Sequence, residues 1–156
     1  MFLDDFLAAA IEGRISSSAG SGANTAALTV VANTVDGEAT IKSSDAVGVH
    51  SANCSNVTLD QLNFRASNGG LAMEVRLAID VITNVAIFVG FTDVISTTVE
   101  LPSFKASGAD TLQSDADNAC GVGFDTQGTT DQWWHGGVKA TTDTAATHSG
   151  TAPTGG

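Results

Sequence analysis

Two cysteines and three histidines are the residues best suited to nucleophilic chemistry, and none stands in a known catalytic pattern. The cysteines are Cys54 and Cys120, and the histidines are His50, His135 and His148. A thiol becomes a nucleophile when a neighbouring base removes its proton. A Cys–His nucleophile would need Cys54 or Cys120 to lie beside a histidine in space, an alternative that the sequence leaves open, and there is no nucleophile elbow or phosphate-binding loop. We predict no catalytic residue and two reduced, mostly buried thiols, with a single disulfide as the alternative.

Carboxylates are the second group that could carry chemistry. A glycoside hydrolase needs two acids about 5–10 Å apart in a cleft, and Glu74 lies beside Arg76 in an alternating polar row. Such a row is more simply a solvated sheet face. Residues 115–118 and 125–131 hold oxygen ligands of the kind that Ca²⁺ prefers. Because Asp and Asn also favour turns, we predict turns at both places, no metal site and no cofactor.

The pair Trp133–Trp134 could bind a ligand or a partner. Adjacent residues of a strand face opposite sides of a sheet. One ring should therefore enter the core, and the other should face solvent or a partner. An outward tryptophan can stack on a sugar or anchor a protein interface. Trp133 and Trp134 are accordingly candidate partner-binding residues, and a glycan-binding module is the alternative function.

Strands must position these side chains. Between residues 71 and 81 apolar and polar residues alternate, as in a strand with one wet face. Residues 85–91 are apolar on both faces, which favours a covered, central strand. Because about three residues connect the two segments, they should form an antiparallel hairpin.

Shorter strands are predicted elsewhere. Candidates are residues 27–32, 38–42, 119–124 and 132–139, with a weaker one at 57–64, and Asp36–Gly37 should turn the first into the second. Alternate glycines in 119–124 would let a backbone or a bulky ring approach closely. Strands at this spacing without long helices predict an all-β protein, an antiparallel β-sandwich of the jelly-roll type.

The two ends of the chain differ from its middle. Residues 4–12 could form a short capped helix, followed by a Ser/Gly/Ala linker at 16–24. This arm either docks on a neighbouring subunit or folds back on its own sandwich. After Lys139 no apolar strand pattern remains. We predict an arm and linker (1–24), a sandwich domain (25–140), and a flexible or partner-bound tail (141–156).

Composition excludes several function classes. The 156 residues are 42% hydrophobic and 15% charged, which argues against intrinsic disorder. The net charge of −11 would repel a phosphate backbone, so we expect no direct nucleic-acid binding. No apolar run approaches the roughly 18 residues of a membrane helix. The acidic start, Asp4–Asp5, is unlike a secretory signal.

Four segments carry a resemblance to a known family. They are LAMEVRL (71–77), NVAIFVGFTD (84–93), NACGVGFD (118–125) and TDQWWHGGVK (130–139). Together they resemble tailed-bacteriophage virion proteins with a concanavalin-like jelly-roll fold. The resemblance implies a non-enzymatic capsid decoration (cement) protein on the outer capsid surface, assembled in the host cytoplasm. It implies the major capsid protein as partner and a homotrimer. The contact residues would lie in the arm, at Phe2, Leu3, Phe6 and Leu7.

Overall fold

The chain is built from β-strands wherever its structure is described. The computed structural model describes residues 16–18, 27–31, 38–42, 55–58, 70–80, 82–94 and 101–152. All pairing in these ranges is antiparallel. The predicted all-β, antiparallel class is confirmed, whereas the sandwich or jelly roll stays a prediction. The predicted helix at 4–12 lies outside the described residues, and those residues include no helix able to cross a membrane.

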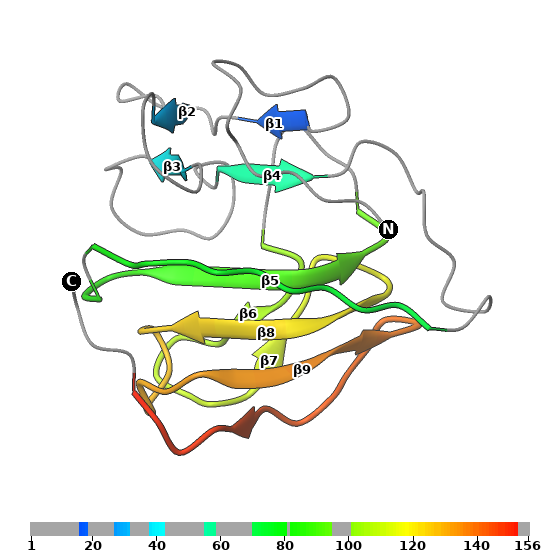
Figure 1. Cartoon of the computed structure of the whole chain (residues 1–156). Coiled ribbons are helices and arrows are strands. Elements are labelled where there is room, and N and C mark those ends of the chain that lie inside the picture. The colour runs from blue at the N-terminus through cyan, green and yellow to red at the C-terminus, as the bar shows by residue number, and fades with distance from the viewer. Residues whose placement is uncertain are drawn as a thin grey trace. The chain divides into compact units, whose positions relative to one another are not determined.

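Two compact units make up the chain, the first comprising residues 1–63 and 95–100, and the second residues 64–94 and 101–156. The described strands of the first unit form two pairs (Figure 1), namely β1 (Ser16–Ser18) with β4 (Asn56–Thr58) and β2 (Ala27–Val31) with β3 (Glu38–Lys42). The predicted strands at 27–32 and 38–42 are confirmed. The candidate at 57–64 is confirmed only in part, and β1 lies in the predicted linker. The predicted domain limits stay a prediction.

The main sheet of the second unit has the strand order β10–β9–β8–β5, with β11 also paired to β9. Its long strands (Figure 1) are β5 (Ala86–Thr92), β8 (Ala119–Asp125) and β9 (Trp134–Lys139). They confirm the strands predicted at 85–91, 119–124 and 132–139. A separate ribbon pairs β6 (Phe104–Lys105) with β7 (Leu112–Gln113). Two-residue strands of this kind have no periodic pattern by which a sequence could reveal them.

Glycines allow two aromatic rings to lie on one face of this sheet. The pairing register places Phe88 opposite Gly123, and Gly123 opposite Trp134. The centroids of the two rings are 6.3 Å apart. A Cβ added at Gly123 would overlap the Trp134 ring, and one at Gly121 would overlap the Phe88 ring. The predicted close approach of a ring to the glycines of 119–124 is therefore confirmed.

The core of the second unit lies on that same face. Buried Ala116, Ala119 and Val138 form a cluster, against which Phe88 and Val94 pack. The β6–β7 ribbon covers part of the face, because a Cβ at Gly136 would meet the Leu112 side chain. On β8 the opposite face is exposed at Cys120 and Val122 but buried at Phe124, whose ring centroid lies 5.7 Å from that of Trp133. One sheet face thus packs inward, and the other carries exposed side chains at the Cys120 end of β8.

The hairpin predicted between residues 71–81 and 85–91 is wrong. Residues 71–79 form no strand, and β5 pairs instead with β8 along seven residues. Among the described residues β5 has no partner other than β8 and stands at the end of the strand order, and all its residues are half-buried rather than covered. A period of two fixes which side chains share a face but does not choose the neighbouring strand.

Part of the predicted C-terminal tail belongs to the sheet. Strand β10 (Thr142–Asp143) and strand β11 (Thr147–His148) both pair with β9 of the same chain. The turn into β10 contains Ala140 and Thr141, both with positive φ. These strands are polar, so hydropathy gave no sign of them.

Candidate functional site

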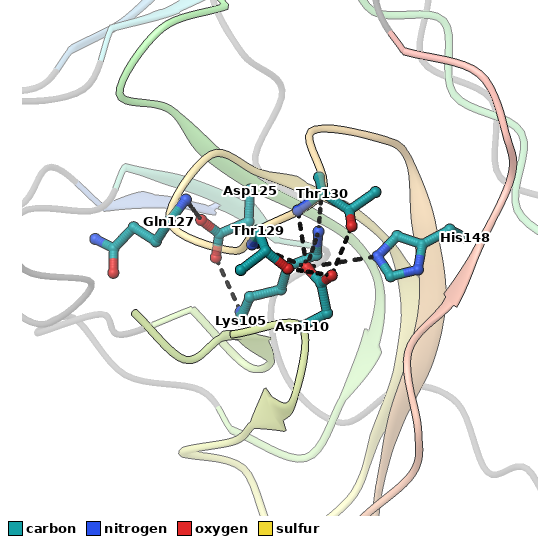
Figure 2. Close-up of polar contacts among 7 residues, drawn as sticks. All are labelled: Lys105, Asp110, Asp125, Gln127, Thr129, Thr130 and His148. Carbon is teal, nitrogen blue, oxygen red and sulfur yellow. Dashed lines mark hydrogen bonds and ion pairs between the residues drawn. The ribbon is translucent and has the colours of Figure 1, made fainter. Parts of the chain in front are cut away.

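A buried lysine is at the centre of the most densely bonded polar cluster in the described residues (Figure 2). The Lys105 side chain has no exposed surface, and its ammonium lies 3.2 Å from Asp110 Oδ1. The ammonium also donates a hydrogen bond to the Thr130 carbonyl. The backbone N–H of Lys105 donates to Asp125 Oδ2 at 2.9 Å. Strand β6 is thereby bonded to the end of β8 and to the turn that follows it.

Two threonines surround the Asp110 carboxylate. The backbone N–H groups of Thr129 and Thr130 donate to Asp110 Oδ1 at 3.1 and 3.0 Å. Their hydroxyls donate to Asp110 Oδ2, each at 2.6 Å. These bonds from Thr129 and Thr130, together with the Lys105 ammonium, hold the pKa of the Asp110 carboxyl far below its usual value. Asp110 is therefore ionised at neutral pH.

His148 closes the cluster from the last described strand. Its Nε2 atom is buried without a hydrogen-bond partner and lies 3.9 Å from Asp110 Oδ1. Figure 2 shows the imidazole of β11 directed toward the Asp110 carboxylate. The cluster thus joins β6, the loop after it, the turn after β8, and β11.

The cluster is suited to holding loops in place rather than to transforming a substrate. A lysine nucleophile needs an accessible amine, but the Lys105 ammonium is enclosed and already bonded to Asp110 and Thr130. Asp125 also has a local structural role, because its Oδ1 accepts the Gln127 N–H at 2.8 Å within the turn. This geometry favours the turn that the sequence predicts at residues 125–131.

No described group of three or more His, Cys, Asp or Glu residues is arranged to hold a metal ion. The other predicted turn, at 115–118, has its own hydrogen-bond partners. Asn118 donates from its backbone N–H to Asp93 Oδ1 at 3.0 Å and from Nδ2 to Asp93 Oδ2 at 2.9 Å. Its Oδ1 accepts the Ala140 N–H at 3.0 Å. Asn118 therefore ties the end of β5 to the β9–β10 turn.

A shallow, open groove of about 380 Å³ lies over β8 and β9. Its lining residues include Cys120, His135, Gly136 and Gly137. The register places Cys120 opposite Gly137 and His135 opposite Val122, so the thiol and the imidazole are diagonal neighbours. Cβ atoms at such diagonal positions are about 7 Å apart. The thiol and the imidazole could therefore form a hydrogen bond only if their side chains turned toward each other. No hydrogen bond joins these two described side chains, so the groove lacks an assembled Cys–His pair.

Cys120 is a free thiol, but it is exposed. Its predicted burial is wrong, because Cys120 occupies the open face of β8, whereas Ala119 beside it faces the core. Cys54 lies outside the described residues, as do the predicted contact residues Phe2, Leu3, Phe6 and Leu7. The roles predicted for those four stay predictions.

The tryptophans differ in burial. Trp134 is 1% exposed and packs against Phe88, so it is a core residue and offers no surface to a partner. Trp133 is half-buried, with its ring centroid 5.7 Å from that of Phe124. The register decides between the two, because Trp134 lies opposite Gly123, where space for a ring exists. A partner-binding role for Trp133 stays a prediction.

Sequence reasoning missed the Lys105 cluster. The sequence assigns no role to His148, and the other members lie up to 25 residues apart, as Lys105 and Thr130 do. No short-range pattern marks such a group. The Thr129–Thr130 pair, placed directly after a strand and a turn, is the one local sign of an anion-binding position.

The family resemblance seen in the sequence stays a prediction. Comparisons of the chain with protein-family models, with curated proteins and with solved structures give no match.

Proposed function

We propose that this chain is a non-enzymatic structural protein of a tailed-bacteriophage virion, a decoration protein that binds the outer capsid surface and stabilises the head. The observation that carries the proposal is a row of large apolar side chains left in contact with water. Leu71, Met73, Val75 and Leu77 are 37%, 46%, 51% and 40% exposed. Soluble proteins keep such rows mainly where another protein covers them. The resemblance of four segments between residues 71 and 139 to virion proteins supports a phage capsid as the assembly that covers this row.

The charge of the chain suits this role. A net charge of −11 keeps separate copies soluble until they meet the shell. The Lys105 and Asp110 charges face each other and hold loops, which supports a shape-keeping rather than a catalytic use. Stabilisation of the head would be additive, because many copies each contribute a few contacts between neighbouring capsid subunits.

The partner in this proposal is the major capsid protein, and the decoration protein acts as a homo-oligomer, with a trimer as the expected state. The N-terminal arm supplies the contact residues Phe2, Leu3, Phe6 and Leu7, and Trp133 is a further contact. Copies assembled in the host cytoplasm end on the outside of the virion.

Heads assembled without this chain provide the test. Purified protein should cosediment with them and should raise the temperature at which they release DNA. Replacing Phe2, Leu3, Phe6 and Leu7 by alanine should abolish both effects. The matched control carries Ser107→Ala and Gln113→Ala, two exposed positions of the second unit, and should bind as the wild type does.

Heads that release DNA at the same temperature with and without bound protein would contradict the stabilising role. Cosedimentation equal to that of an unrelated acidic protein would contradict capsid binding itself. If the alanine arm variant binds normally while the wild type stabilises the heads, the function holds and the contact residues lie elsewhere.

A further inference from the structure

Residues 71–80 form an unpaired segment with the pattern of a strand. Apolar Leu71, Met73, Val75, Leu77 and Ile79 alternate with Ala72, Glu74, Arg76, Ala78 and Asp80. Every residue from 71 to 78 is exposed, so both rows face water. The segment (green in Figure 1) shows no helical turn, and its residues make no hydrogen bond within the described part of the chain. Backbone groups along it are therefore free to form a β-ladder.

The segment is complementary to itself when it is reversed. In an antiparallel pair centred on Val75, each residue lies opposite the one equally far on the other side of the centre. Glu74 then lies opposite Arg76, and Arg76 opposite Glu74. On the other face Met73 meets Leu77, and Leu71 meets Ile79. Opposite charges and apolar pairs at facing positions are the contacts that stabilise a strand pair.

We propose that residues 71–79 of two copies pair antiparallel about a two-fold axis at Val75, making a continuous strand pair between subunits. The contact is isologous, because the same surface is used by both copies. It brings the apolar rows of the two copies, five side chains from each, side by side on one face and places two Glu74–Arg76 pairs on the opposite face.

Charge complementarity favours pairing of this segment with a second copy over pairing with strand β5 of the same chain. Strand β5 of the same chain has no second partner among the described residues, and its sequence AIFVGFT carries no charge. Pairing with β5 would leave Glu74 and Arg76 without opposite charges across the ladder. Pairing with a second copy gives both of them one.

This inference goes beyond the proposed function and does not depend on it. A two-fold contact does not by itself build a trimer, but it joins two copies or two larger assemblies. Crosslinking of the strand pair would assign the exposed row of residues 71–77 to a second copy and leave the capsid contact to the arm. Failed cosedimentation with heads would count against capsid binding alone.

Cysteine crosslinking of the full chain tests the register directly. In a background with Cys54→Ser and Cys120→Ser, Val75→Cys should form a disulfide-linked dimer under mild oxidation, because facing residues at the axis have Cα atoms about 5 Å apart. Met73→Cys alone should not crosslink, since its two copies lie about 13 Å apart along the strand. The same holds for Leu77→Cys. A mixture of the Met73→Cys and Leu77→Cys proteins should crosslink, as these positions face each other.

Charge reversal supplies an independent test by sedimentation. Glu74→Arg or Arg76→Glu alone should weaken self-association about tenfold or more, because symmetry converts two attractive pairs into two repulsive ones. The double variant Glu74→Arg/Arg76→Glu should associate as the wild type does. An equimolar mixture of the two single variants should also associate, because each then faces its opposite charge.

Positions 73–77 are exposed, so we expect these substitutions to leave the fold intact and each result to count for or against the strand pair. Absence of crosslinks at position 75 and in the 73/77 mixture overturns the proposal, and so does crosslinking that is equal at all three positions. A crosslink from position 75 to a cysteine introduced in β5 of the same chain would assign the segment to its own sheet. Single variants that do not associate when mixed would exclude this register.

Discussion

Asp110 accepts four hydrogen bonds from two threonines while facing a lysine that has no contact with water. An enclosed ammonium is costly without a carboxylate beside it. The carboxylate in turn needs donors for both oxygens, and Thr129 and Thr130 supply them. The residues of this cluster therefore depend on one another, and the loss of one affects all.

Asp110→Asn tests this dependence. The Lys105 ammonium would lose its counter-charge, and we expect the free energy of unfolding at pH 7 to fall by about 2 kcal/mol, between the values for exposed and buried pairs. The carboxyl pKa of Asp110 is depressed in the folded state, so its stabilisation is present above the unfolded pKa of about 4 and is lost as pH falls below that value. Urea unfolding between pH 7 and pH 2.5 measures both effects.

Two control variants accompany that experiment. Asp143→Asn, at an exposed position, should change stability by less than about 0.5 kcal/mol. Lys105→Met combined with Asp110→Asn should recover part of the loss, because no buried charge remains. If Asp110→Asn has the same acid slope as the wild type, the depressed pKa of Asp110 does not stabilise the fold.

Gly123→Ala should be destabilising although it adds only one methyl group. The new Cβ would overlap the Trp134 ring and force it out of its place against Phe88. Overpacking of this kind costs about 1–3 kcal/mol. Cys120→Ala on the open face of the same strand is the control and should be nearly neutral. Equal urea midpoints for the two variants would mean that the ring moves aside freely.

In the β9–β10 turn the backbone conformation is unfavourable for the residues that occupy it. Ala140 has φ 48° and Thr141 has φ 63°, a left-handed pair that suits Asn–Gly and is unfavourable for a β-branched residue. Hydrogen bonds hold the turn, with the Thr141 N–H donating to the Asp117 carbonyl at 3.0 Å. Contacts from the loop before β8 therefore stabilise a strained connection.

Replacing Ala140–Thr141 by Asn–Gly should raise the free energy of unfolding by about 1 kcal/mol, since the new residues adopt positive φ with little strain. The urea midpoint measures the gain. Ala140→Val, which puts a β-branched residue at positive φ, should lower the midpoint and serves as the opposite control. A midpoint unchanged in both proteins would mean that the turn relaxes to another conformation.

Sequence patterns predicted elements better than their pairing. Strands β2, β3, β5, β8 and β9 were predicted because each has a period of two or an apolar run bounded by turn residues. The pairing of 71–81 with β5 was wrong, because β5 finds in β8 a partner whose Gly121 and Gly123 accept the Phe88 and Trp134 rings. That fit depends on residues more than thirty positions apart, which no local pattern reports.

The candidate site was predicted still less well. The sequence indicated one inward and one outward tryptophan, and only the register with Gly123 identifies Trp134 as the inward one. The Lys105 cluster could not be predicted, because its members come from separate strands and loops. The open face of β8, with exposed Cys120, likewise follows from what covers the sheet, which composition does not specify.

The whole molecule has a strong acidic excess, with a net charge of −11 and an isoelectric point near 4.2. Mutual repulsion of this charge limits non-specific association of copies at neutral pH and so opposes aggregation through the exposed apolar row of residues 71–77. Near the isoelectric point this repulsion vanishes while the apolar row remains.

We therefore expect a turbidity maximum near pH 4.2. Val75→Ser together with Leu77→Ser should reduce it, because less apolar surface then meets between copies. Val57→Ser, at a half-buried position of β4, is the matched control and should reduce it less. Turbidity that is the same for all three proteins would mean that the exposed row does not drive association.

Because Lys105 is enclosed, the rate at which it reacts can report how often the loops around it open. An amine-reactive acylating reagent can reach the exposed Lys139 in the native state, but it can reach Lys105 only while the loops around that residue are open. The rate of acylation at Lys105, relative to Lys139, therefore counts openings of the second unit. Measured by mass spectrometry on free protein and on assembled particles, the ratio would report how strongly assembly holds each copy closed.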